Sequence, residues 1–173
     1  MKSVFQALAK YNSSVDQSII ELIEPLSEEK IMTKTKAFFP SIFETLLHLF
    51  SSDLFWLKRF RDVFKESNIL TVSNLVSLDG NNLRKEFETD YTKLFQHRKQ
   101  ADQVILQFIE EINEDTLNSV INYKNYKGDD VEKELWKILL QWFNHQTHHR
   151  GQISVLLDMI GVNNDYSSML TRI

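Results

Sequence analysis

The 173-residue sequence contains no cysteine, only four glycines and two prolines, and no excess of basic residues. Without cysteine the chain can form no disulfide, offer no thiolate to a metal and use no cysteine nucleophile. This absence fits a reducing compartment, and we expect a cytoplasmic protein. The scarcity of glycine and proline favours long helices. A net charge of −4 argues against nucleic acid as a partner, because phosphate binding needs a basic surface.

The sequence also lacks an apolar run long enough to span a bilayer, and its first ten residues have no apolar signal-peptide core. We therefore expect no membrane partner. The hydrophobic fraction of 42% and the charged fraction of 25% are typical of a globular protein. This length suits one domain, so we predict a single helical domain over residues 1–173.

Apolar residues recur at spacings of three and four in four long segments, which predicts four helices. The predicted helices span residues 3–26, 41–60, 83–112 and 131–160. Residues 61–82 carry turn-forming pairs and lack a sustained period, so we expect a long connection that lets the third helix run parallel to the second. Alternating residues in 118–128 predict a small extended segment or hairpin. The predicted fold is an all-α four-helix bundle.

The last predicted helix carries three of the five histidines. His145 and His149 are four residues apart, so they are neighbours on one helix face and can chelate a divalent metal. The motif differs from that of the zincins, because Gln146 replaces the glutamate that would follow the first histidine. At about 100° per residue, His145 and His149 fall in the apolar sector of the helix, and His148 falls outside it.

A buried histidine needs a partner for each ring nitrogen, or a metal. His145 and His149 can therefore be hydrogen-bonded core residues or metal ligands, and their helical phase alone leaves both readings open. His48 lies in the polar arc of the second helix, where it is either a surface residue or lines a cleft facing the pair. His97 falls in the charged stretch 96–100, which predicts a solvated face.

Asp53 falls within the apolar arc of the second helix, so its carboxylate should be paired or strongly hydrogen-bonded. We interpret it first as a structural anchor and second as a catalytic acid or base. The sequence does not identify its partner.

The second and last helices carry more apolar residues than one core contact needs, which favours a homodimer. On the last helix these additional residues are Trp136, Leu139, Phe143 and Leu157.

Four stretches of the chain together carry a family resemblance. They are Tyr11-Asn12, residues 45–57 with His48, Asp53 and Trp56, the Tyr-rich and Gly-ended segment 123–128, and residues 144–152 followed by an aliphatic run and Gly161. In this combination the chain resembles the DinB family of metal-binding four-helix proteins, the DinB/YfiT-like group, over nearly its whole length. Residues 144–152 are the most specific match.

The resemblance implies a DinB/YfiT-type bundle and a divalent metal held by His48, His145 and His149. Zn or Ni is the first expectation, with Fe, Co or Mn as alternatives, because sites of three histidines accept all of these metals. His148 is expected outside the site. Gln152 lies about one turn beyond His149, and we expect it, with Asp53, to support the ligands or line the pocket.

Three histidine ligands leave coordination positions open, as in catalytic metal sites. Similar families use such sites to transfer low-molecular-weight thiols or to hydrolyse small molecules, so a small thiol or electrophile is the expected substrate. The thiol must arrive with the substrate, because the chain has no cysteine. The residues identify no catalytic acid or base. The alternatives are a non-catalytic metal-binding protein associated with stress or damage, and a helical interaction module without metal.

Overall fold

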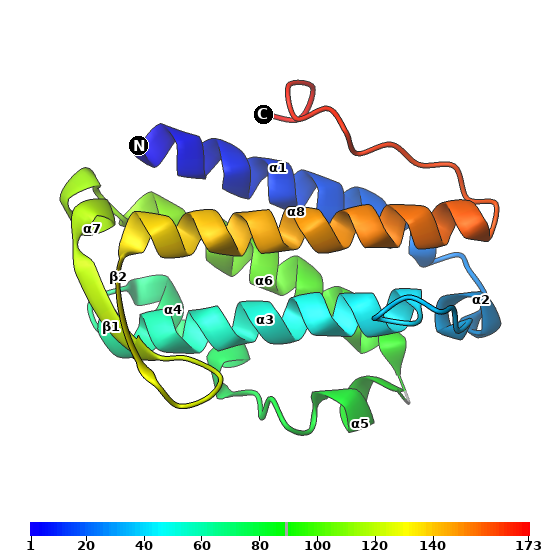
Figure 1. The fold of residues 1–173 in the computed structure, drawn as a ribbon, viewed down its shortest axis with the longest axis horizontal. Helices are drawn as coiled ribbons and strands as arrows, with labels where there is room; N and C mark the ends of the chain where they lie inside the picture. Colours follow the sequence, from blue (N-terminus) through cyan, green and yellow to red (C-terminus); the bar gives the residue numbers. More distant parts are fainter. Residues whose placement is uncertain (89) are drawn as a thin grey trace.

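Four long helices form the body of the computed structural model, which describes residues 1–88 and 90–173 (Figure 1). They are α1 (Lys2–Ile23), α3 (Ile42–Val63), α6 (Tyr91–Glu111) and α8 (Leu135–Met159). Both α1 and α3 pack against α6 and α8, so α1 lies diagonally across the bundle from α3. The helices bury their apolar stripes against one another, and Leu57, Phe108 and Trp142 are among the core side chains that are at most 1% exposed. The predicted four-helix fold is confirmed.

The long connection between α3 and α6 sets the topology. The sequence colours in Figure 1 show α1 and α8 running in one direction and α3 and α6 in the other. Parallel α3 and α6 require a chain that returns along the bundle, as predicted from residues 61–82. This connection contains α4 (Asn68–Val72), the 3-10 helix η1 (Asn74–Ser77) and α5 (Leu83–Glu88).

The predicted extended segment before the last helix forms an antiparallel hairpin. It pairs β1 (Val120–Lys124) with β2 (Asp130–Glu134), and Val120 lies opposite Glu134. Gly128, at φ 88°, allows the chain to turn between the strands. The prediction that the last helix starts at residue 131 is wrong, because residues 130–134 pair with β1 and α8 begins at Leu135. Short helices α2 (Glu28–Met32) and α7 (Glu114–Asn118) complete the elements.

The prediction of one continuous helix over 83–112 is also wrong. The chain forms α5 up to Glu88 and starts α6 at Tyr91, and residue 89 lies outside the described residues. Asp90 has non-helical backbone angles, φ −154° and ψ 81°, and its carboxylate accepts a 2.5 Å hydrogen bond from the Thr92 hydroxyl. Local side-chain bonding of this kind competes with helical hydrogen bonding and favours a break.

One end of α3, which carries His48, and one end of α8, which carries His145 and His149, are capped. Ser41 caps α3, because its hydroxyl accepts a 3.2 Å hydrogen bond from the Glu44 backbone N–H. Gly161, at φ 78°, ends α8, and the Val162 backbone N–H donates to the Leu157 carbonyl at 2.9 Å. This glycine-terminated arrangement is common at helix C-termini.

The apolar residues that prompted the homodimer prediction lie inside the subunit on α8. Leu139, Phe143 and Leu157 are at most 1% exposed, and the partly buried Trp136 packs against the core. Their burial is accounted for without a partner chain. Across residues 1–88 and 90–173, no helix has the length and apolar character needed to cross a membrane.

Candidate metal centre

Three histidines from two neighbouring helices meet at one point. His48 comes from α3, and His145 and His149 come from successive turns of α8. The Nε2 atom of His48 lies 3.1 Å from that of His145 and 3.2 Å from that of His149, and the two α8 nitrogens are 3.0 Å apart. The polar arc of α3 therefore faces α8, and the three nitrogens form a nearly equilateral triangle.

The triangle fits one metal ion. Zn–N bonds are about 2.0–2.1 Å long, and a point about 2.1 Å from all three Nε2 atoms lies only about 1.1 Å from the plane of the triangle. An ion can therefore contact all three nitrogens without movement of the rings. A set of three imidazoles leaves further coordination positions open and does not determine which divalent metal binds.

Gln152 sets the protonation of His149. The His149 Nδ1 atom lies 2.7 Å from the Gln152 Oε1 atom. An amide oxygen only accepts hydrogen bonds, so Nδ1 carries the proton and the Nε2 lone pair points into the triangle. The Gln152 Nε2 atom donates to the His148 Nε2 atom at 3.2 Å. Gln152 therefore accepts a hydrogen bond from His149 and lies beside the histidine cluster.

A substitution at Gln152 tests whether its hydrogen bond with His149 supports metal binding. We expect Gln152→Ala to weaken metal binding by about 10–100-fold, because the hydrogen bond that orients a ligand ring is lost. Gln141→Ala, an exposed position on the same helix, is the matched control and should bind as the wild type does. Competition with a chromophoric chelator measures both affinities. Equal affinities in the two variants would contradict the role of Gln152.

The segment between α2 and α3 covers one side of the cluster. The Phe39 ring stacks on the His48 ring at a centroid distance of 4.1 Å and an interplanar angle of 21°. It also meets the His149 ring edge-on at 5.3 Å. The aromatic ring shields one face of His48 from water. The sequence did not reveal the role of Phe39, for which the only signal is an aromatic pair before Pro40.

The surroundings of all three histidines favour the neutral form, which metal binding requires. Burial, reinforced by repulsion from the neighbouring His149, lowers the pKa of His48 to about 4. Burial and the other histidines lower the pKa of His145 to about 4 as well. Burial also lowers the pKa of His149, and its hydrogen bond with Gln152 opposes that shift.

These shifts predict how the stability of the metal-free protein depends on pH. A histidine in the unfolded chain titrates near 6.5, whereas His48 and His145 titrate at about 4 in the folded protein. Between these values the unfolded state binds more protons, so stability falls as pH falls through this window and is unaffected by these groups above it. Urea unfolding at about pH 7.5 and about pH 5 measures the change. The double variant His48→Gln/His145→Gln should show a flatter dependence; an identical dependence would contradict this assignment.

The remaining two histidines lie elsewhere. His148 is exposed on α8, as its helical phase predicts. His97 lies on α6, where its Nδ1 atom is 2.7 Å from the Lys93 carbonyl and its ring packs against Phe50 and Phe87. The predicted solvated face over 96–100 is wrong for Arg98, which is 1% exposed. Arg98 follows the buried Leu94 by one turn, which places it on the inward face of α6.

Asp53 is completely buried, and Arg98 is its charged partner. Its Oδ2 atom accepts from Arg98. Its Oδ1 atom accepts from the Trp142 indole N–H at 2.7 Å and from the Gln146 amide. These contacts fit the interpretation of Asp53 as a structural anchor. The carboxylate bonds to the residue next to His145 rather than to a histidine, so it does not line the histidine cluster.

The anchor extends into a buried polar network across the bundle. Arg98 also donates to Asp16 at 2.6 Å and to Asp102 at 2.9 Å. Burial and the charge of Asp16 raise the pKa of Asp102 well above its ordinary value. Sequence reasoning missed most of this network, although each member is a polar residue in the apolar phase of its helix. The missed members are Asn12, Asp16, Arg98, Asp102, Gln146 and Arg150.

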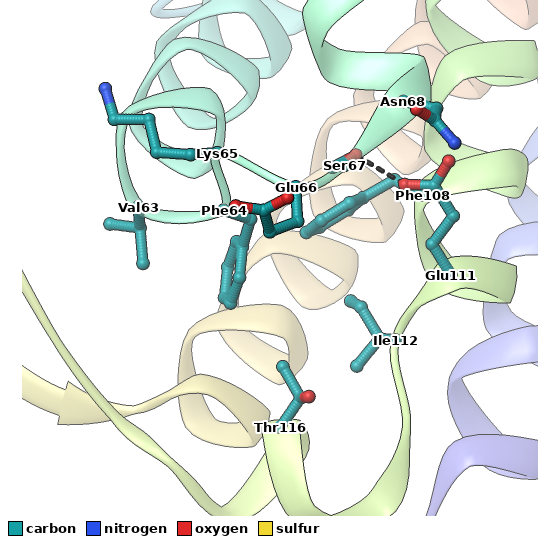
Figure 2. Close-up of a pocket in the computed structure, with 10 residues that line it drawn as sticks. All are labelled: Val63, Phe64, Lys65, Glu66, Ser67, Asn68, Phe108, Glu111, Ile112 and Thr116. Atoms are coloured by element: carbon teal, nitrogen blue, oxygen red, sulfur yellow. Dashed lines mark hydrogen bonds between the residues drawn. The ribbon is translucent and has the colours of Figure 1, made fainter.

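Two surface hollows lie at different distances from the histidine cluster. One, of about 550 Å³, lies between residues 35–37 and α8 and is lined by Gln152, Leu156 and Met159 among others. The other, of about 650 Å³, lies at the opposite end of α3, where Phe64 and Phe108 form part of its wall (Figure 2). Phe64 is sixteen residues from His48, about 24 Å along a helix axis. Only the first hollow adjoins a residue that contacts a histidine of the cluster.

Comparisons with known proteins identify a family for this chain. The model of the DinB family matches residues 1–168. The chain is also similar to Protein DinB of Bacillus subtilis (strain 168), with 25% identity over 154 residues that cover 89% of this chain and 84% of that protein. No solved structure matches the chain.

Proposed function

The chain belongs to the DinB family, and we propose that it binds one divalent metal ion through His48, His145 and His149. Zn or Ni is the first candidate, and Fe, Co or Mn are the alternatives. The observation that carries the proposal is the triangle of three Nε2 atoms at 3.0–3.2 Å. Hydrogen bonds among the rings explain at most two of the three contacts, because the His149 Nε2 atom carries no proton and each of the other two Nε2 atoms can donate only one.

We further propose that the site is catalytic and transfers a low-molecular-weight thiol to an electrophile, with hydrolysis of a small molecule as the other reaction. Three protein ligands leave positions for water or substrate, whereas structural zinc sites usually have four protein ligands. A bound metal would lower the pKa of a water or thiol that it coordinates. The apolar hollow beside Gln152 offers space for a substrate next to the site.

The chain's own residues have separate tasks in this proposal. His48, His145 and His149 hold the ion in their neutral forms. Gln152 orients His149, and Phe39 shields the His48 ring from water. The thiol is supplied by the substrate because the chain has no cysteine. Asp53 is engaged by three hydrogen-bond donors and contributes to structure rather than to proton transfer.

Elemental analysis of protein purified without a histidine tag tests the metal, and a screen of thiols with electrophiles then tests turnover. We expect about one equivalent of metal per chain and turnover that stops when a chelator removes it. Metal without turnover of any thiol or hydrolytic substrate would favour a non-catalytic metal-binding protein. Protein that contains no metal and acquires none would instead favour a helical interaction module.

A homodimer is a separate proposal. Its remaining support is the exposed apolar side chains of α8, namely Leu140, Val155 and Met159, which are 50–65% exposed. We expect sedimentation at micromolar concentration to show a species of twice the 20.4 kDa chain mass. A species of the single-chain mass alone would contradict the proposal.

A further inference from the structure

The metal triangle depends on the distance between two helices. His145 and His149 are placed relative to each other by the turn of α8 itself. The position of His48 relative to them depends on how closely α3 packs against α8 and in which register. A shift of about 1 Å between the helices would move one of three nitrogens out of bonding range, since metal–ligand distances vary by only about 0.2 Å.

Buried hydrogen bonds between these helices involve residues that are near the histidines in the sequence. Asp53 follows His48 by five residues on α3, and Gln146 is the residue after His145 on α8. A single Asp53 oxygen, Oδ1, accepts hydrogen bonds from both Gln146 and Trp142, so one buried carboxylate bonds two successive turns of α8.

The other two helices hold this contact in place. From α6, Arg98 donates to Oδ2 of Asp53. From α1, the Asn12 amide donates to Oε1 of Gln146 at 2.7 Å. The Gln146 amide is therefore engaged at both its oxygen and its nitrogen and is 1% exposed, so its orientation is fixed. Buried hydrogen bonds are directional and costly to break, whereas apolar side chains repack with smaller loss.

We propose that Asp53, Trp142, Gln146, Arg98 and Asn12, here called the interhelix clamp, set the spacing and register of α3 against α8. Within this clamp Asp53 and Gln146 are positioning residues that determine metal affinity through His48. The inference rests on the proposed metal binding at the three histidines. The clamp orders the triangle before an ion arrives, which reduces the reorganisation that binding would otherwise require.

Two clamp variants and one control test the inference. Asp53→Asn removes the charge that pairs with Arg98, and Gln146→Met removes the link between Asp53 and Asn12 with little change in side-chain length. Phe108→Leu perturbs the core at the opposite end of the bundle, beside the cavity in Figure 2. Zn(II) affinity is measured by chelator competition and ligand geometry by the visible spectrum of bound Co(II), at a temperature where circular dichroism shows each variant folded.

We expect each clamp variant to lose about tenfold or more in Zn(II) affinity and to change the Co(II) spectrum. Phe108→Leu should retain the wild-type Zn(II) affinity and the wild-type Co(II) spectrum, because a general loss of stability does not alter the geometry of a folded site. If Asp53→Asn fails to fold, Gln146→Met decides the question, since it leaves no charge unpaired.

The outcomes separate the clamp from the proposed function. Wild-type affinity and an unchanged spectrum in the folded clamp variants would overturn the clamp and leave the metal site standing. An equal loss of Zn(II) affinity in Phe108→Leu would also overturn the clamp, because the loss of affinity would then follow from reduced stability of the fold. A wild-type protein that binds no Zn(II) or Co(II) would overturn the metal site and, with it, the role assigned to the clamp.

Discussion

Replacing His48, His145 or His149 with alanine should abolish stoichiometric metal binding, whereas His148→Ala should leave it intact. Each of the first three contributes one nitrogen to the triangle, so each alanine leaves two protein ligands. We expect a loss of affinity larger than the ~100-fold upper range for residues that only support ligands. Elemental analysis after dialysis against a weak chelator measures the metal retained.

His148→Ala is a matched control because it removes an imidazole from the same helix, one residue away from a proposed ligand. The exposed His148 side chain contacts the amide nitrogen of Gln152, and the Gln152 oxygen still accepts from His149 without it. His97→Ala is a second control on a different helix. If all five alanine variants lose metal to the same extent, the assignment of ligands is wrong.

Replacing Arg98 with methionine should destabilise the protein by about 3–5 kcal/mol, the range for breaking a buried ion pair by removing one partner. Arg98 is 1% exposed and forms ion pairs with Asp16, Asp53 and Asp102. Methionine fills part of the volume but leaves these carboxylates without their shared cation. Urea unfolding of the metal-free protein measures the loss.

Lys99→Met is the control for this change. Lys99 is the next residue, and its ion pair with Glu24 is about half exposed on both sides. An exposed pair contributes about 0–1 kcal/mol, so this variant should remain close to the wild type. Equal losses in the two variants would show that the buried network contributes no more than a surface ion pair.

The sequence predicts the histidine pair of α8 well because one helix determines its geometry. A spacing of four residues and the phase of the apolar stripe are local properties, and both distinguish His145 and His149 from His148. The hairpin and the long connection were also predictable from local patterns. The hairpin follows from the alternation of residues, and the connection follows from turn-forming pairs. The choice of His48 came from the family resemblance, because a lone histidine in a polar arc is more often a surface residue.

Features that depend on contacts between distant segments were not predictable. The sequence placed Asp53 in an apolar arc but could not identify Arg98, which lies 45 residues away on another helix. Arg98 was wrongly predicted to be solvated because it lies in a charged stretch of the sequence. Its position on the helix nevertheless places it on the inward face of α6. Phe39 was missed because a loop has no periodicity that reveals which ring packs on which histidine.

Anomalous diffraction at the zinc edge, from crystals of the untagged protein loaded with one equivalent of Zn(II), tests the central claim most directly. We predict one strong peak at a position about 2.0–2.1 Å from the Nε2 atoms of His48, His145 and His149. A peak bound only by other residues, or no peak within reach of all three histidines, would contradict the metal site.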